Sequence, residues 1–439
     1  MDFLDSSYNP LSPICEGWLG KIKRANEAKQ PFNDVAEECM RFFSADVGWM
    51  WNEAGKKKGF TGEFGGMTPR FQMTVAKAFE AVAIIGPVLY HQNPVRTVTP
   101  RSLLELPPEL FAFDPYGQMM QQQLFMEQQQ MAAGDKIIAE LLRLTQNYAV
   151  NELPHGGLRR HAQRSIREGI IKGRGLLWTE PLRRGDGSAI VGSFYGSVDE
   201  LAIDPDSESV DDAWWVARKV TEPVWEVARR TGIPEEFLRD KCQLESGNSQ
   251  GEREGQAFQK DNRAAGKTND LLVYYKIWSN MGIGARLTDV KTDLKDVLEE
   301  LIGDHAYLEV AKGVPFPLNL PNELLLTPGR EEEIAQAAQW PIPYHTDNRW
   351  PFSELDFYEQ PNCAWPIALL QPALGELRFI NTMMSHLCNR IWTSSRDFIA
   401  IKKSANEEFK KLIQHGDDQT IIELEAALGV RIEDCVQFL

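Results

Sequence analysis

The stretch DDAWWVARKVTEPVWEVARRTG, from Asp211 to Gly232, decides how the middle of this chain is interpreted. Its two leading aspartates favour a helix N-terminus, because carboxylates complement the positive end of the helix dipole. We therefore predict one amphipathic helical region over residues 210–232, interrupted at Pro223. The stretch also holds three tryptophans, Trp214, Trp215 and Trp225. These either pack in the core or contact a second subunit, since aromatic residues are enriched at interfaces.

A long helix is predicted closer to the C-terminus. Apolar residues recur there at alternating steps of four and three, which is close to the repeat of packed long helices. Pro372 fits only in a first turn, so the helix begins near Gln371 and runs for about 25 residues, or about 38 Å. Such a helix either packs against other long helices or lies inside the core. The seam consists of Leu370, Leu374, Leu377, Asn381, Met384, Cys388 and Ile391.

The rest of the chain alternates predicted helices with short strands. Helices are expected within residues 1–100 and over 136–150, 158–173 (a basic helix), 294–302 and 331–339. Strands are expected over 175–180, 189–195 and 198–203, as a small antiparallel sheet packed against helices, and over 271–278. After the long helix, strands at FIAIKK (from Phe398) and IIELE (from Ile421) flank a short helix over 406–415.

These elements predict an α+β fold in four parts. Residues 1–150 form an N-terminal helical part, and residues 151–360 form an α+β part. Prolines 341, 343, 351, 361 and 366 mark the boundary before a long helix within 361–397. Residues 398–439 form a small α/β part.

Composition limits the compartment and the partners. The chain has 47 Lys plus Arg against 63 Asp plus Glu, a net charge of -16, which disfavours unassisted binding to nucleic acid or an anionic membrane. Six cysteines include no C-x-x-C pair, as expected for reduced thiols in a cytosol. We see neither a signal-peptide pattern nor an apolar run of about 18 residues, and therefore expect no membrane span.

Motifs for catalysis are weak. Gly247-Asn248-Ser249-Gln250-Gly251 matches the G-x-S-x-G nucleophile elbow, but polar residues stand where the elbow needs an apolar strand and a helix. No phosphate-binding loop is present, the Asp204–Glu208 repeat lacks the later ligands of a calcium loop, and the seven histidines are scattered. We therefore expect no enzyme activity, no cofactor and no metal site. A serine hydrolase using Ser249 is kept as the rival hypothesis.

Several segments, taken in order, resemble the portal proteins of tailed bacteriophages. They are IIGPVLYHQNPVRTVTP from Ile84, the Gly-rich GRGLLW from Gly173, Asp204-Pro205, the Asp211–Gly232 stretch, and QPALGELRFINTMMSHL from Gln371. The resemblance covers most of the chain from about residue 80, and it implies a helical and small-sheet wing, a long stem helix and a small α/β clip. The family's second stem helix, tunnel loop and crown have no counterpart before Leu439, so we expect a truncated chain or a portal of unusual design.

The resemblance implies a non-enzymatic subunit of a ring, usually a dodecamer, at one vertex of the capsid. Through this ring a terminase drives double-stranded DNA in, and through it DNA leaves toward the tail, with weak contacts to the channel. The implied partners are other copies of the chain, the major capsid protein, terminase and a tail adaptor. The implied location is the virion, after assembly in the host cytoplasm. Another phage structural or scaffold protein remains an alternative.

Candidate contact residues follow from this resemblance. A basic patch at the expected clip would meet terminase or the adaptor, unless it is a solvated helix face. It consists of Lys402, Lys403, Lys410 and Lys411. The cations of the long helix, Arg378, Arg390 and Arg396, would face either the DNA channel or neighbouring carboxylates.

Overall fold

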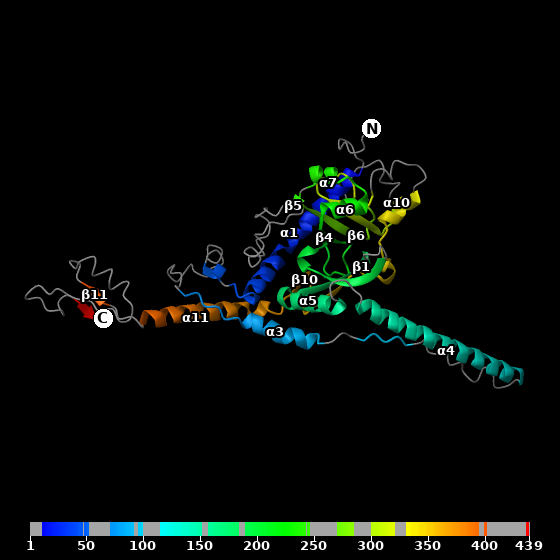
Figure 1. Ribbon diagram of the computed structural model, residues 1–439, viewed down its shortest axis with the longest axis horizontal. Coiled ribbons are helices and arrows are strands. Elements are labelled where there is room, and N and C mark those ends of the chain that lie inside the picture. The colour runs from blue at the N-terminus through cyan, green and yellow to red at the C-terminus, as the bar shows by residue number, and fades with distance from the viewer. Residues whose placement is uncertain are drawn as a thin grey trace, which may run out of the picture. The chain divides into compact units, whose positions relative to one another are not determined.

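The computed structural model has helices and antiparallel sheets, which confirms the α+β class (Figure 1). It describes residues 11–46, 48–51, 71–91, 95–99, 115–151, 157–183, 189–242, 244–245, 270–284, 300–320, 331–394, 399–401 and 436–438. The chain divides into two compact units. Unit 1 is Met1–Ser44 with Ala76–Leu374, and unit 2 is Ala45–Val75 with Gly375–Leu439. This division differs from the four predicted segments.

A five-stranded antiparallel sheet forms the centre of unit 1. Strand β6 (Leu271–Ser279) pairs along its whole length with β4 (Trp215–Pro223), and β4 pairs with β3 (Leu201–Ile203). On its other edge, β6 pairs with β7 (Ala306–Ala311) and with β5 (Leu244–Glu245). Every residue of β7 is buried, because the sheet is covered on both faces there.

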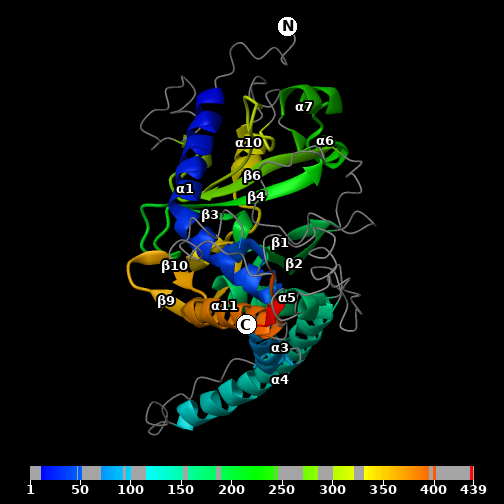
Figure 2. The same ribbon diagram turned by 90° about the vertical axis from the view of Figure 1, so that its left-hand side faces the viewer.

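The N-terminal helix α1 (Ser12–Phe43) packs against this sheet, as Figure 2 shows. Its buried side carries Ile14, Trp18 and Ile22, which join a core with Trp215 and Leu308. The indole nitrogen of Trp18 donates to the carbonyl of Ile283 at 3.0 Å, so this large side chain is both buried and satisfied. The first helix of the predicted N-terminal helical part therefore completes the core of the segment that follows it.

The helix predicted over residues 210–232 is wrong in its first half. Residues Trp215–Pro223 form strand β4, and only Val224–Thr231 are helical, as α6. Sheet pairing on both sides of β4 satisfies its backbone and overrides the helical spacing of its apolar residues. Pro223 ends the strand in an extended conformation and precedes α6, which stops at Gly232 with a φ of 74°.

A second sheet of three strands has the order β2-β1-β8. Strands β1 (Arg174–Arg183) and β2 (Ala189–Gly196) form the hairpin that the sequence predicted, and β8 (Phe352–Asp356) pairs with the other edge of β1. The predicted strand over 198–203 divides into a 3-10 turn, η3 (Val198–Glu200), and β3, which belongs to the five-stranded sheet.

Helix α5 (Gly157–Lys172), also predicted, packs on one face of the three-stranded sheet. The contact is close because Gly175 lies under the helix: a Cβ at this position would stand 2.3 Å from the carbonyl oxygen of Ser165. Side chains alternate along a strand, so Trp178 and Glu180 point from β1 to the opposite face, toward the five-stranded sheet.

Other helices and turns complete unit 1. Helix α4 (Pro115–Asn151) is longer than the predicted 136–150, and it includes residues 117–134, which are rich in glutamine and methionine. The predicted helix over 331–339 is confirmed as α10 (Glu331–Ala338). The remaining elements are α3 (Lys77–Leu89), α7 (Glu235–Lys241), η5 (Tyr344–Asp347), β9 (Tyr358–Gln360), β10 (Cys363–Ile367) and η6 (Gln371–Ala373).

The long helix of unit 2 is confirmed as α11 (Leu374–Ser394), but Pro372 lies in the preceding 3-10 turn η6 and not, as predicted, in the first turn of a helix that starts near Gln371. The preceding residues of the predicted stem segment form β10 rather than helix. One side of α11 buries Asn381 and Ser385, which hold an extended segment of the same unit. The amide of Val75 donates to Asn381 Oδ1 at 2.7 Å, and the amide of Met73 donates to Ser385 Oγ at 2.9 Å.

Three further elements are described in unit 2. The 3-10 turn η1 (Gly48–Trp51) precedes the extended segment, and β11 (Ile399–Ile401) pairs with β12 (Val436–Phe438). Strand β11 lies where FIAIKK predicted one. The predicted helix over 406–415, the predicted strand at IIELE and most of the predicted 294–302 helix lie outside the described residues.

Candidate assembly surfaces

Several predicted site residues lie outside the described part of the chain. They are Lys402, Lys403, Lys410, Lys411 and Arg396, together with the rival nucleophile Ser249. Arg378 and Arg390 are described, and both belong to α11. They are separated by about 18 Å along the helix axis and by about 120° around it. Arg378 is partly buried and Arg390 is exposed, so α11 does not bring the two guanidinium groups together.

The three predicted interface tryptophans have different environments. Trp215 is fully buried and meets Trp18 edge to face, with ring centroids 5.8 Å apart, so its prediction as a subunit contact is wrong and it packs in the core. Trp214 and Trp225 remain 55% and 47% exposed. The guanidinium of Arg229 lies 5.7 Å from the centre of the Trp225 ring. Strand alternation explains the difference, since Trp214 and Trp215 point to opposite sides.

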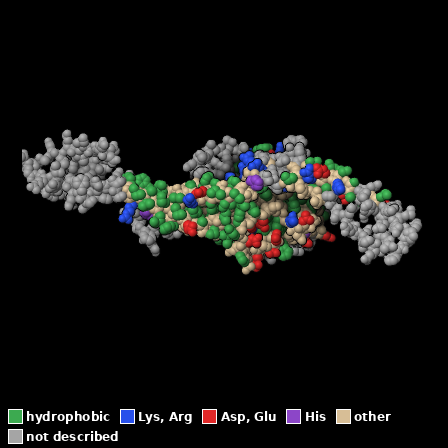
Figure 3. Space-filling view, turned by 90° about the horizontal axis from the view of Figure 1, so that it is seen from below, with side chains coloured by type: hydrophobic (Ala, Val, Ile, Leu, Met, Phe, Trp, Pro, Cys, Tyr) green, Lys and Arg blue, Asp and Glu red, His purple; other side chains and the backbone are tan. Residues whose placement is uncertain are grey.

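Helix α11 carries a second apolar row, of which the sequence analysis named only Ile391, as the last residue of the predicted seam. Phe379, Met383, Leu387 and Ile391 follow one another at steps of four and are 51% to 65% exposed. Figure 3 shows hydrophobic side chains gathered along α11. The described part of unit 2 packs against the opposite side of the helix, through residues such as Asn381. In the sequence, this row is visible as apolar residues that recur at every fourth position beside the predicted seam.

Two helices of unit 1 also expose apolar side chains. Helix α3 exposes Phe79, Ile84, Val88 and Leu89. Helix α4 exposes Met126, Met131, Ile137, Ile138, Leu141, Leu142 and Leu144. Exposed apolar side chains mark an interaction site where they form one large contiguous patch. Among the described residues, no helix combines the length and hydropathy that a membrane span requires.

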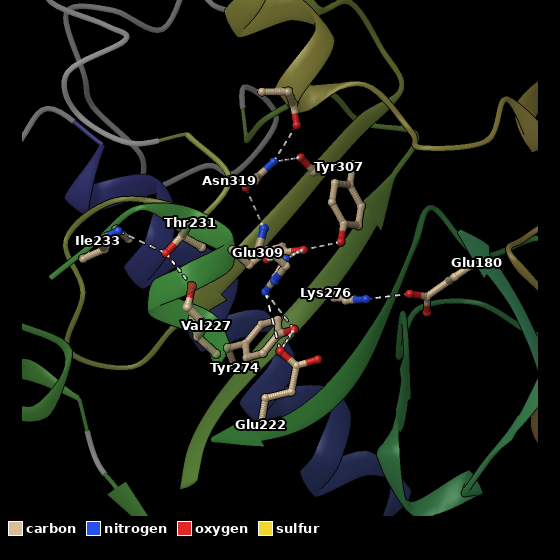
Figure 4. A network of polar contacts seen from close by, with 12 residues as sticks. Glu180, Glu222, Val227, Thr231, Ile233, Tyr274, Lys276, Tyr307, Glu309 and Asn319 are labelled. Carbon is tan, nitrogen blue, oxygen red and sulfur yellow. Dashed lines mark hydrogen bonds and ion pairs between the residues drawn. The ribbon is translucent and has the colours of Figure 1, made fainter. Parts of the chain in front are cut away.

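The polar network in Figure 4 connects α6 with the five-stranded sheet. Arg230 Nη1 donates to both carboxylate oxygens of Glu309, at 2.7 and 2.6 Å, and Arg230 Nη2 donates to the Tyr274 hydroxyl at 2.9 Å. Tyr307 donates to Glu309 Oε1 at 2.6 Å. Burial, followed by the nearby Glu309, raises the pKa of both tyrosines, so they stay protonated and neutral. The terminal nitrogens of Arg230 and both tyrosine hydroxyls have internal partners, whereas the buried Arg230 Nε has none, and the network is structural.

A cavity of about 280 Å³ lies beside the start of β7. It is lined in part by His305 and His345, whose rings stack with centroids 4.4 Å apart, and by Trp340 and Trp350. Burial, and then His345, lower the pKa of His305. No lining residue is a serine, threonine or cysteine, and no three ligand-type side chains in the described ranges are grouped to hold a metal ion.

Comparisons with known proteins do not assign a family to this chain. No model of a known protein family matches the sequence, and a search of curated proteins finds no significant match. The resemblance to portal proteins rests on the sequence segments that carry it and stays a prediction.

Proposed function

We propose that this chain is a portal-type subunit that assembles into a ring with other copies of itself. The ring would occupy one capsid vertex in contact with the major capsid protein, dock terminase and a tail adaptor, and form the channel for DNA packaging and ejection. In this proposal the protein acts by assembly and electrostatics, and it has no catalytic centre, cofactor or metal.

The observation that supports this proposal most is the two-sided character of α11. One side of the helix carries the buried Leu377, Asn381 and Ser385, and the last two bind the backbone of Val75 and Met73 in the same unit. The other side presents the apolar row Phe379, Met383, Leu387 and Ile391. A helix that carries apolar side chains on two sides needs a second partner to cover the exposed side. In a ring, each neighbouring copy supplies that partner. The order of α+β unit, long helix and small strand pair also agrees with the wing, stem and clip that the resemblance implies.

Native mass spectrometry and negative-stain microscopy of the full chain test this proposal. Closed rings of about a dozen copies with a central hole are the expected result. Compact monomers of the full-length gene product would overturn it. A globular oligomer without a central hole would instead favour another structural or scaffold protein. Labelling of the native protein by a serine-directed probe, lost in Ser249→Ala, would favour the hydrolase.

A further inference from the structure

Helix α5 presents an arginine face to solvent. Arg159, Arg160, Arg164 and Arg167 are exposed and lie within an arc of about 140° around the helix. The residues on the opposite arc, including His161, Ser165 and Glu168, are buried against the three-stranded sheet. No acidic residue occurs from Gly157 to Arg167, although the chain as a whole is strongly acidic.

The charges of α5 are used differently on its two sides. On the buried side, Lys172 pairs with Glu168 at 3.0 Å and with Asp199, so these charges are neutralised internally. On the exposed side, Arg159 donates to the backbone carbonyl of His91 at 3.3 Å. Arg164 and Arg167 have no ion-pair partner within the described residues. Two unpaired arginines one turn apart form a surface suited to carboxylates, which the guanidinium binds in bidentate geometry.

An exposed acidic loop occurs elsewhere on unit 1, between β3 and β4. Asp206, Glu208, Asp211 and Asp212 are all exposed. The loop is ordered by internal bonds: Ser207 Oγ donates to the carbonyl of Asp204 at 2.7 Å, and Trp350 Nε1 donates to the carbonyl of Val210 at 2.8 Å. Next to these acids, Trp214 exposes 55% of its surface. Carboxylates beside an exposed indole form a receptor for arginine, which pairs with the acids and stacks on the ring.

The two surfaces lie on different sides of unit 1. Helix α5 covers one face of the three-stranded sheet, through the contact of Gly175 with Ser165. Val210 of the acidic loop packs in the cluster of Trp178 and Trp350, which lies on the opposite face of that sheet. One copy of the chain therefore cannot bring its own arginine face to its own acidic loop. A contact between them joins two copies through unlike surfaces, and such heterologous contacts form a ring when the rotation between copies closes and an open filament when it does not.

We propose that the arginine face of α5 in one copy docks on the acidic loop, residues 206–212 with Trp214, of the next copy. This inference rests on the proposed ring assembly and names a contact that orders its subunits. The occupant is a second copy, because the same chain supplies the arginines, the complementary carboxylates and the exposed Trp214 beside those carboxylates. Arginine and tryptophan are also the residues most enriched in the energetically dominant parts of interfaces.

Charge reversal and its rescue test this contact in the full chain. R164E/R167E alone and E208K/D211K alone should each lower the ring fraction at least tenfold at matched concentration. The combined variant should recover it, because the opposite charges again face each other. The control R24E/K312E reverses two exposed cations elsewhere on unit 1 and should leave ring formation unchanged.

The alternatives give distinct results. If the wild-type chain forms no rings, the proposed function fails; if it forms rings that R164E/R167E leaves intact, the contact is overturned while the proposed function stands. Loss of rings without rescue by the combined variant also overturns it. If R164E/R167E keeps its rings but no longer binds a short DNA duplex, the arginine face is assigned to nucleic acid instead. Cross-linking gives an independent measurement. In the variant R164K, a zero-length amine–carboxylate cross-linker should join the lysine at position 164 to residues 206–212 of another copy. If that lysine is joined only to other carboxylates, the proposal is contradicted.

Discussion

Trp178 of β1 stacks on Trp278 of β6, with ring centroids 5.4 Å apart and planes inclined by 29°. The two residues belong to different sheets, so this pair is where the two sheets of unit 1 meet. Phe352 of β8 and Tyr307 of β7 extend the contact, at 4.8 Å from Trp178 and 5.3 Å from Trp278. The stability of unit 1 therefore depends on aromatic packing between sheets as well as on pairing within each sheet.

Replacing Trp178 with Ala should destabilise the protein by about 3–5 kcal/mol, because the indole is fully buried and its removal leaves a cavity. Urea denaturation followed by far-UV circular dichroism measures this change. Trp225→Ala is the matched control, since Trp225 is 47% exposed, and we expect it to cost less than about 1 kcal/mol. Equal effects of the two substitutions would contradict the role of the inter-sheet stack.

Glu180 supplies the polar part of the same junction. Its Oε1 accepts from Arg218 at 2.9 Å and its Oε2 accepts from Lys276 at 2.5 Å. Burial alone would raise the pKa of Glu180, but the two cations outweigh it and the pKa is lowered. The stabilisation is then complete above the pKa of the unfolded carboxyl, about 4.3, and is lost as the pH falls through the lower folded value.

Glu180→Gln should therefore destabilise the protein at pH 7 by about 3–5 kcal/mol, since it removes the carboxylate that Lys276 and Arg218 share and leaves Arg218 with Glu200 alone. The difference in the free energy of unfolding between wild type and variant should shrink below about pH 4. Urea titrations at pH 7, 5 and 3.5 measure this difference. A difference that is the same at all three values would show that charge pairing is not its cause.

Lys29 of α1 gives a pH dependence of the opposite sign. Its ammonium donates to the carbonyls of Val198 and Leu201, at 2.5 and 2.9 Å, within the core. Burial lowers the pKa of Lys29 to about 7 from a usual 10.5, although Asp199 opposes this effect. Between these two values the unfolded chain binds a proton that the folded chain does not, so stability rises with pH in this window.

The free energy of unfolding of the wild type relative to Lys29→Met should increase between pH 7 and 9, with a slope of at most about 1.4 kcal/mol per pH unit. Methionine keeps most of the length of the side chain and removes the titration. Urea midpoints of both proteins at pH 7, 8 and 9 give the slope. A difference that stays constant from pH 7 to 9 would mean that Lys29 stays charged in the folded state.

Gly175 allows α5 to lie close to β1, and Gly175→Ala should cost at least about 1–3 kcal/mol, since the added Cβ would overlap the Ser165 carbonyl oxygen. Gly375→Ala provides the comparison. No atom stands within 4 Å of a Cβ at Gly375, and this residue is inside α11, where alanine favours the helix by about 1 kcal/mol. Thermal denaturation should show opposite shifts for the two variants. A neutral Gly175→Ala would mean that the helix can move away from the sheet.

The local elements of this fold were largely predictable from the sequence. The β1–β2 hairpin, α5, β6 and α10 follow from apolar periodicity and turn residues, and the start of α11 follows from Pro372. The strand at Trp215–Pro223 was not predictable in this way, because its identity depends on pairing with β6, more than 50 positions away for most partners. The pairing of Trp178 with Phe352 is also remote, and apolar patterns do not encode which strands become neighbours.

The candidate surfaces were predictable only in part. The sequence analysis named the exposed Trp214 and Trp225 as interface candidates, but it also named the buried Trp215. Composition alone does not separate core tryptophans from interface tryptophans. The arginines of α5 were visible as a basic helix, but their common exposed face required knowledge of which side packs on the sheet. The apolar row of α11 was hidden beside the predicted seam, since a helix with two apolar sides gives a weak periodic signal.

Substitutions in the apolar row of α11 should affect assembly without affecting the folding of the subunit. Met383 and Leu387 are 53% and 51% exposed within the described chain, so the double substitution Met383→Gln/Leu387→Gln should change the free energy of unfolding of the subunit by less than about 1 kcal/mol. If the row packs against a neighbouring copy, the same substitution buries two amides in an apolar contact and should abolish closed rings in native mass spectrometry. Glu376→Gln, at an exposed position of the same helix, should leave them intact. Intact rings in the double variant would place the subunit contact elsewhere, and loss of rings with a large loss of stability would mean that the row packs inside the subunit.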